Sequence, residues 1–369
     1  MKVLLVSIIE GKENPLLHQV AMEELEDLTK TAGYEILDKV IVPIRTIDPK
    51  TYMGKGKLEE LVHFYDTPHL DGIIIQQEIS ASQIRAIEEK TLCEVITRTE
   101  LILRIFALHA KTKIAKMQVE LAQLNYLLPR LVGKGVEMSR IRGGIGMRGP
   151  GEQKLEIDRR LVRKRIYQLS QRLEALEKGM QERRKKRRKM QHSVALVGYT
   201  NAGKSSLLNA LTHSQVYVED KLFATLDTTS RRLWLTGEKG YIQVVITDTV
   251  GFIQDLPHTL VESFRSTLLE TIDTDLIIHV VNSVHPAYLQ QIEIVQKTLS
   301  EIQAETVPQI LCFNKIDMLE TEVYLELRRN FPKAYFLSAK TKENLSLLRE
   351  AIYRFFVGEK EEKFLDGFF

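Results

Sequence analysis

Residues 193–208 of the chain are SVALVGYTNAGKSSLL, and they determine which kind of fold we expect. An apolar run over 194–197 is typical of a buried strand, and a helix is expected from near Lys204. Between them, Gly198 to Ser205 matches the pattern G-x-x-x-x-G-K-[ST]. Backbone N–H groups of such a loop surround phosphates, the lysine contacts the β- and γ-phosphates, and the Ser205 hydroxyl binds Mg²⁺. A chance glycine turn is the alternative, but the strand–loop–helix context favours a phosphate-binding loop.

Three later motifs each follow an expected strand. Asp248-Thr-Val-Gly251 ends the strand expected over 241–247. The Asp248 carboxylate can hold Mg²⁺, usually through water, and the Gly251 N–H can contact a γ-phosphate. Asn314-Lys315-Ile316-Asp317 follows the strand expected over 310–313. The Asp317 carboxylate can accept hydrogen bonds from the ring N–H and the exocyclic amine of guanine, a donor pair that adenine lacks.

The last motif is Ser338-Ala339-Lys340, after the strand expected over 334–337. Its backbone N–H groups can contact the guanine carbonyl. Four motifs in this order, each at the carboxyl end of a strand, predict a P-loop GTPase domain with a mostly parallel sheet.

The rest of the chain predicts two further parts. Over 1–98, strands at 3–9, 36–44, 72–76 and 95–96 alternate with helices at 16–31, 55–65 and 80–91, which favours a small α/β sheet. Two stripes of apolar residues at helical spacing then predict two long helices that pack as an antiparallel hairpin. The stripes are Ile114, Met117, Leu121, Leu124 and Leu128, and Leu161, Ile166, Leu169, Leu173 and Leu176. The predicted domains are an amino-terminal α/β part (1–99), the hairpin (100–190), the GTPase domain (191–356) and a short charged tail (357–369).

Composition excludes several classes of protein. The 369 residues are 44% apolar and 27% charged, which is ordinary for a globular chain and unlike disordered or collagen-like sequences. No apolar run reaches the roughly 18 residues that a membrane span needs. Cys93 and Cys312 provide neither a disulfide framework nor a metal-binding spacing. We therefore expect a cytoplasmic protein, and a monomer because the apolar faces can be satisfied within the chain.

Positive charge is concentrated in one segment. The chain has a net charge of +3, yet residues 159–190 alone hold 14 Lys/Arg against three Glu. The run from Arg183 to Lys189 is entirely cationic. Such a run is either a solvated helix end or a patch that binds a polyanion.

The hairpin loop, residues 132–152, contains seven of the 20 glycines together with Arg142 and Arg148. A loop of this length without its own pattern is usually functional or disordered. Arginines between glycines suit RNA phosphates, although a plain solvent loop is the alternative.

Longer segments give a family resemblance. LFATLDTT (222–229), TDTVGFIQDLPHTLVESFRSTL (247–268), MQVELAQLNYLLPRL (117–131) and GGIGMRGPGE (143–152) together resemble the HflX family, and YMGKGKLEEL (52–61) is similar to its amino-terminal domain. These are ribosome-associated GTPases that bind the large ribosomal subunit, and some separate ribosomes into subunits. The resemblance implies a Mg²⁺-dependent GTPase that converts GTP to GDP and phosphate on the ribosome.

The resemblance also assigns residues. Thr225 becomes the switch threonine that completes Mg²⁺ coordination with Ser205 and Asp248 in the GTP state, with Thr228 and Thr229 as nearby rivals. Lys204, Thr225 and Gly251 become the residues of the hydrolytic step. The implied nucleotide contacts are Gly198, Tyr199, Thr200, Asn201, Ala202, Gly203, Lys204, Ser205, Ser206, Phe223, Ala224, Thr225, Leu226, Asp227, Asp248, Thr249, Val250, Gly251, Asn314, Lys315, Ile316, Asp317, Ser338, Ala339 and Lys340. The implied contacts to ribosomal RNA are Arg142, Gly143, Gly144, Gly146, Arg148, Gly149, Gly151 and the run from Arg183 to Lys189.

Position 252 is informative because Ras-like enzymes have a glutamine there to orient the attacking water. Here it is Phe252, so another group must complete that task, with Gln254 and His258 as nearby polar candidates.

Two other functions remain open. One is an ATP-driven RNA-remodelling enzyme, against which the guanine-specific Asp317 argues. The other is a signalling GTPase with only protein or membrane partners, for which no lipidation motif is present.

Overall fold

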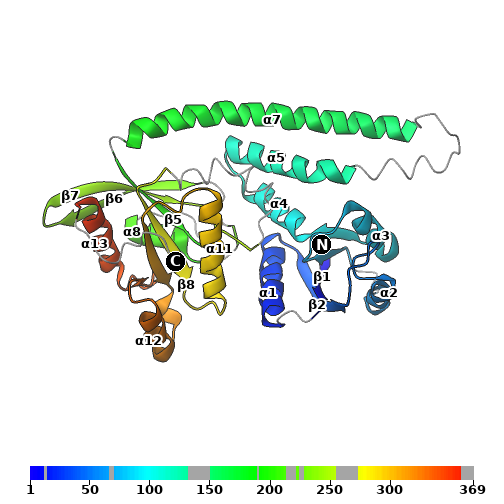
Figure 1. The fold of residues 1–369 in the computed structure, drawn as a ribbon, viewed down its shortest axis with the longest axis horizontal. Helices are drawn as coiled ribbons and strands as arrows, with labels where there is room; N and C mark the ends of the chain where they lie inside the picture. The colour runs from blue at the N-terminus through cyan, green and yellow to red at the C-terminus, as the bar shows by residue number, and fades with distance from the viewer. Residues whose placement is uncertain are drawn as a thin grey trace. The chain divides into compact units, whose positions relative to one another are not determined.

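The computed structural model describes residues 1–11, 15–65, 70–131, 150–188, 191–212, 222–223, 228–254 and 273–358 (Figure 1). The chain divides into two compact units, each with its own sheet. The first contains Met1–Leu108 and Lys116–Leu173, and the second contains His109–Ala115 and Glu174–Phe369.

The first unit is built on a four-stranded parallel sheet in the order β2-β1-β3-β4. The expected alternation of strands and helices is confirmed. Its elements are β1 (Lys2–Glu10), α1 (Pro15–Thr31), β2 (Glu35–Ile44), α2 (Lys55–Phe64), β3 (Gly72–Ile75), α3 (Ala81–Thr91), β4 (Glu94–Thr97) and α4 (Arg98–His109). Central strand β1 is fully buried from Val3 to Val6 because helices cover both faces of a parallel sheet of this kind.

Two long helices follow, α5 (Lys113–Arg130) and α7 (Pro150–Arg188), and within the first unit they lie side by side and antiparallel (Figure 1). The Arg165 guanidinium donates to both oxygens of the Glu120 carboxylate, with Nε–Oε1 at 2.6 Å and Nη2–Oε2 at 2.9 Å. Leu169 and Leu173 on α7 are buried, as their spacing predicts. Leu161 and Leu176 were expected on the same stripe, but they are 59% and 41% exposed. At 100° per residue, Leu161 lies about 80° around the helix from Leu169, so it turns away from the contact.

The second unit contains a six-stranded sheet in the order β10-β9-β8-β5-β7-β6, parallel except for the antiparallel pair β6–β7. The expected mostly parallel sheet is confirmed. Its elements are β5 (His192–Val197), α8 (Lys204–Thr212), β6 (Thr229–Gly237), β7 (Gly240–Asp248), β8 (Leu276–Asn282), α11 (Tyr288–Glu301), β9 (Gln309–Asn314), the 3-10 helix η2 (Ile316–Met318), α12 (Thr321–Asn330), β10 (Tyr335–Phe336) and α13 (Leu345–Phe356).

Helices cover both faces of this sheet. On one face, a core formed by Leu196 and Val280 packs against α8 and α13. On the other, Val197 and Ile277 pack against residues of α11 such as Val295. The carboxyl ends of the parallel strands meet along one edge, where loops between strands and helices place functional side chains. Among the helices of the described ranges, none is long and apolar enough to cross a membrane.

Candidate nucleotide site

The loop from Gly198 to Ser205 connects β5 to α8, as expected from the sequence. Gly198 has φ +153°, and a β-carbon there would lie 2.1 Å from the backbone oxygen of Val280 on β8. Gly203 has φ +88°, and a β-carbon would lie 2.3 Å from Nδ2 of Asn314. Only glycine allows the loop to pass this close to its neighbours, so the two motif glycines set the path of the backbone around the site.

Lys204 begins α8, and its side chain is buried beneath the loop. Its ammonium donates to the backbone oxygens of Gly198 at 3.0 Å and Tyr199 at 2.8 Å. Burial lowers the pKa of Lys204 to about 8, and the nearby Asp248 carboxylate opposes part of this shift. An ammonium whose hydrogen bonds within the described residues go to two neutral carbonyls can exchange them for phosphate oxygens, which bind a cation more strongly.

Ser205 and Asp248 are adjacent in space although 43 residues separate them in the chain. The Ser205 hydroxyl donates to Oδ2 of Asp248 at 2.5 Å, and Asp248, the last residue of β7, is fully buried. A hydroxyl and a carboxylate are the hard oxygen donors that Mg²⁺ prefers, so this pair fits the ion. Within the described ranges, no group of three or more His, Cys, Asp or Glu residues could hold a metal ion. Phosphates and water would therefore have to supply the remaining ligands.

Asn314 joins three of the motifs. It is the last residue of β9 and is 1% exposed. Its Nδ2 donates to the backbone oxygen of Ala202 in the loop at 3.0 Å, and its Oδ1 accepts from the backbone N of Ala339 at 2.9 Å. The phosphate-binding loop and the Ser338-Ala339-Lys340 segment are thus tied to the strand that carries Asn314.

The residues after Asn314 continue along the same edge of the sheet. Lys315 adopts a left-handed conformation (φ +69°), and its ammonium lies 3.4 Å from Oδ1 of Asn201. Asp317 lies in η2 directly after this turn. Ser338 is fully buried, and its hydroxyl accepts from the backbone N of Thr341 at 3.0 Å.

Phe252 is 1% exposed and packs in the core with Val197, Ile277 and Val295. Its backbone pairs with the phosphate-binding loop. The N–H of Phe252 donates to the oxygen of Gly198 at 3.0 Å, and the N–H of Thr200 donates to the oxygen of Phe252 at 2.8 Å. The ring at position 252 therefore faces the α11 side of the sheet and takes no part in orienting water.

Several predicted residues lie outside the described residues. They are Arg142, Gly143, Gly144, Gly146, Arg148, Gly149, Lys189, Ala224, Thr225, Leu226, Asp227 and His258. Arg183 to Arg188 and Gly151 belong to α7. Phe223 is buried with φ +55°. Gln254 has an exposed side chain, and its backbone N–H donates to the Tyr199 hydroxyl at 2.8 Å.

Two polar residues were not identified from the sequence, His279 in β8 and Ser283 directly after it. The Ser283 hydroxyl donates to the backbone oxygen of Asn314 at 2.7 Å, which ties the end of β9 to the residue after β8. It follows a strand, so the rule that identified Asn314 could have found it. His279 is buried within the sheet, and burial, with the positive charge of Lys204, lowers its pKa to about 3. It therefore stays neutral beneath the site.

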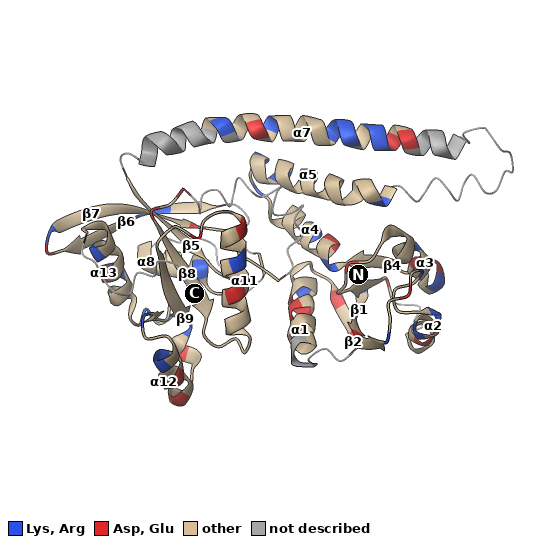
Figure 2. Ribbon diagram, in the orientation of Figure 1, with Lys and Arg blue, Asp and Glu red and all other residues tan. Residues whose placement is uncertain are grey.

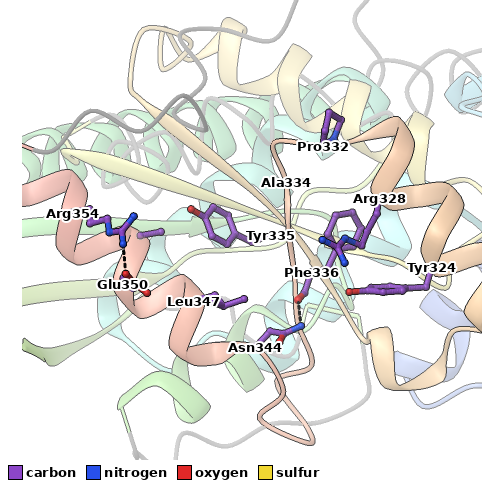
Figure 3. A pocket seen from close by; sticks show the side chains of 11 residues that line it. Tyr324, Arg328, Pro332, Ala334, Tyr335, Phe336, Asn344, Leu347, Glu350 and Arg354 are labelled. Carbon is purple, nitrogen blue, oxygen red and sulfur yellow. Dashed lines mark hydrogen bonds and ion pairs between the residues drawn. The ribbon is translucent and has the colours of Figure 1, made fainter. Parts of the chain in front are cut away.

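A separate pocket of about 510 Å³ lies between β10, α12 and α13 (Figure 3). It contains no residue of the four motifs. Its lining residues are Tyr324, Arg328, Pro332, Ala334, Tyr335, Phe336, Asn344, Leu347, Glu350, Ala351 and Arg354. Arg354 forms an ion pair with Glu350, and the Arg328 guanidinium lies over the Tyr324 ring. This pocket is distinct from the nucleotide site.

The strand–loop–helix geometry and the motifs along one edge of the sheet define a P-loop GTP-binding domain. Comparisons with known proteins agree. Three family models match: GTP-binding GTPase N-terminal over 19–107, GTP-binding GTPase Middle Region over 109–187, and 50S ribosome-binding GTPase over 193–315.

Curated relatives extend the match over almost the whole chain. It is 46% identical to the GTPase HflX of Caldanaerobacter subterraneus subsp. tengcongensis over 98% of this chain and 82% of the relative. It is 42% identical to the GTPase HflX of Escherichia coli K12 over 92% of this chain and 79% of the relative. A crystal structure of SsGBP in complex with GDP matches with a TM-score of 0.53 and 27% identity, over 97% of this chain and 99% of that one. The chain belongs to the HflX family of GTPases and is a GTP hydrolase.

Proposed function

We propose that this chain is a Mg²⁺-dependent GTPase that binds the large ribosomal subunit and rescues or splits ribosomes. The observation that carries the nucleotide part is Asn314, whose side chain links the phosphate-binding loop to the base-binding segments. For the ribosomal part, support comes from the match of residues 193–315 to a family described as a 50S ribosome-binding GTPase. The protein would accordingly be cytoplasmic, ribosome-associated and monomeric.

In the proposed site, each motif has a separate task. Lys204 leaves the carbonyls of Gly198 and Tyr199 to contact the β- and γ-phosphates. Ser205, Thr225 and Asp248 would hold Mg²⁺, which neutralises charge on the phosphates when it is bound. The Gly251 N–H contacts the γ-phosphate, so the segment after β7 distinguishes GTP from GDP.

Guanine recognition would come from the other side of the site. The Asp317 carboxylate accepts the two guanine donors, and the stem of Lys315 stacks on the base. The Ser338-Ala339-Lys340 segment would provide a backbone N–H to the guanine carbonyl; the N–H groups of Ser338 and Ala339 are bound to the Glu343 oxygen and to Asn314 Oδ1. Ala339 is the member of this segment whose N–H is bound to Asn314, so its position follows that of β9.

The proposed RNA contacts lie in the hairpin. Figure 2 shows Lys and Arg repeated along α7, and Arg160, Arg163, Lys164 and Arg172 have exposed side chains. Such cations suit phosphate contact, whose strength falls steeply with salt. The Gly-rich loop with Arg142 and Arg148, and the run Arg183 to Lys189, complete the surface we propose for ribosomal RNA. We also keep the domain boundaries at 99, 190 and 356 as part of this proposal.

The test is GTP hydrolysis by the purified protein alone and with each ribosomal subunit. We expect stimulation by the large subunit, and its loss when residues 143–151 are replaced by a serine-glycine linker of equal length. Nucleotide affinity of the loop variant serves as the control and should not change. Absence of stimulation by either subunit would refute the ribosomal role and leave the GTPase assignment intact.

Two further arms separate the alternatives. Competition of ATP against labelled GTP distinguishes an ATP-driven enzyme, because Asp317 should exclude adenine. Pelleting with ribosomal subunits and with anionic liposomes at matched salt distinguishes an RNA surface from a membrane surface.

A further inference from the structure

Thr200, in the middle of the phosphate-binding loop, packs directly against Gly251. A β-carbon added at Gly251 would lie 2.9 Å from three atoms, namely Cα and Cγ2 of Thr200 and Nζ of Lys204. The Thr200 side chain and the Lys204 ammonium therefore fill the same side of Gly251. This is the side on which the proposed γ-phosphate contact would form.

The Thr200 hydroxyl is a buried polar group in the phosphate-binding loop. Thr200 is 5% exposed, and within the described part of the chain its Oγ1 has no hydrogen-bond partner. Buried hydroxyls almost always have a partner, so an exception calls for an explanation. A methyl group of the same shape would pack equally well, so packing alone does not require the hydroxyl.

Among the described residues that follow β7, neither Phe252 nor Gln254 directs a polar side chain at the site. Phe252 points into the core with Val197, and the Gln254 backbone is bound to the Tyr199 hydroxyl while its side chain is exposed. Thr200 is instead fixed close to the site, because its N–H is bound to the oxygen of Phe252 at 2.8 Å. The same backbone pairing that accompanies the buried ring at 252 thus holds Thr200 where its Cα and Cγ2 lie against Gly251, with the unpaired hydroxyl on the same side chain.

We propose that the Thr200 hydroxyl hydrogen-bonds the water that attacks the γ-phosphate and performs the positioning that Phe252 cannot. The water oxygen bonds to the γ-phosphorus as the bond from that phosphorus to the leaving β-phosphate oxygen breaks. The water proton passes to a phosphate oxygen, and Thr200 neither gains nor loses a proton overall. This inference rests on the proposed assignment of Lys204 and Gly251 to the γ-phosphate.

The experiment compares Thr200→Val with Thr200→Ser in the full-length chain without ribosomes. Valine keeps the shape and removes the hydroxyl, whereas serine keeps the hydroxyl and removes the methyl group. Single-turnover GTP hydrolysis, affinity for fluorescent GDP, and the melting temperature of the nucleotide-free protein are measured for each variant. Thr298→Val, a buried threonine on α11 outside the site, is the matched control.

Thr200→Val should slow hydrolysis by on the order of tenfold to a hundredfold, the range for losing a hydrogen bond in a charged site. GDP affinity should stay within twofold, and the melting temperature should not fall, because an unpaired hydroxyl has been removed. Thr200→Ser should hydrolyse GTP faster than Thr200→Val by a similar factor. Thr298→Val should hydrolyse GTP at the wild-type rate.

Three results would overturn the proposal. These are a Thr200→Val rate equal to that of the wild type, equally slow valine and serine variants, and loss of GDP binding by Thr200→Val. The last would assign the hydroxyl to ground-state binding or folding. If GTP affinity is unchanged by Lys204→Ala, that result would refute instead the underlying assignment of the γ-phosphate site.

Discussion

Replacing Asn314 tests whether one buried amide holds the nucleotide site together. Asn314→Ala removes the bonds to the Ala202 oxygen and the Ala339 N–H, both in the interior of the second unit. Each buried group left unpaired costs about 1–3 kcal/mol, so we expect the free energy of unfolding to fall by about 3 kcal/mol. Because the Ala202 peptide belongs to the phosphate-binding loop, the Kd for GDP should also rise at least about tenfold.

The assay can be restricted to the unit that contains the site. The chain has one tryptophan, Trp234 on β6 of the six-stranded sheet, so its fluorescence in urea reports the unfolding of that sheet. Binding of fluorescent GDP is measured separately. Asn344→Gly is the matched control, because it removes one amide bond, to the Phe336 oxygen at 2.9 Å, at a left-handed residue (φ +57°) outside the site. It should cost about 1 kcal/mol and leave GDP binding unchanged.

The isosteric change Asn314→Asp sharpens the test. Aspartate can still accept from the Ala339 N–H, but it places an oxygen against the Ala202 oxygen and buries a charge, so it should be at least as damaging as alanine. If both Asn314 variants unfold within 1 kcal/mol of the wild type and bind GDP within twofold, then the amide does not connect the motifs and the reasoning fails.

Three further predictions concern other parts of the chain. The pKa of Lys204 is lowered to about 8, and phosphate binds the protonated ammonium more tightly than the neutral amine. The Kd for GDP should therefore be nearly constant below pH 8 and rise about tenfold by pH 9. A flat Kd profile from pH 7 to 9 would contradict this. The ammonium is also a folding cost below that pKa, so its contribution to stability should improve as the pH rises from 8 towards 10. Arg98→Met should lower the free energy of unfolding of the first unit by about 3 kcal/mol, because it removes the guanidinium from a largely buried ion pair with Glu24. The double variant Arg98→Met/Glu24→Leu should recover part of this loss, as measured by circular dichroism in urea, and no recovery would argue against the pair. Phe252→Gln should not accelerate GTP hydrolysis and should cost about 3 kcal/mol, because the amide would be buried without a partner; a faster enzyme would show that the side chain at 252 can reach the water.

The positions of the motifs could be predicted from the sequence because each follows a short apolar strand. Asp248 and Asn314 are the last residues of β7 and β9, and Lys204 is the first residue of α8, as the pattern indicated. Local sequence suffices here, since the strand period, the glycines and the polar residue after the strand lie within a few positions of one another. The guanine and Mg²⁺ roles of these residues remain predictions.

Contacts between distant segments could not be predicted in the same way. Periodicity placed Leu161 on a buried stripe, but burial on α7 depends on where α5 lies, and that is a property of the packed unit. The hydrogen bond from the Ser283 hydroxyl to the Asn314 oxygen joins the residue after β8 to the end of β9, 31 residues apart in the chain. The backbone pairing of Gly198 and Thr200 with Phe252 likewise forms only when β5 and β7 are neighbours in the sheet.

That pairing explains why an apolar residue suits position 252. An isolated bridge pairs the backbone of Phe252 with that of Tyr199 in the phosphate-binding loop, while the Phe252 ring lies in the core. Gly251 faces Thr200 and Lys204, and the side chain at 252 enters the core beside Val197. A glutamine held in this register would be buried and unpaired, whereas phenylalanine is stabilised by the same burial. The close approach of Gly251 to Lys204 and Thr200 therefore leaves the side chain at 252 on the core side, which is why we propose the Thr200 hydroxyl of the phosphate-binding loop as the group that orients water.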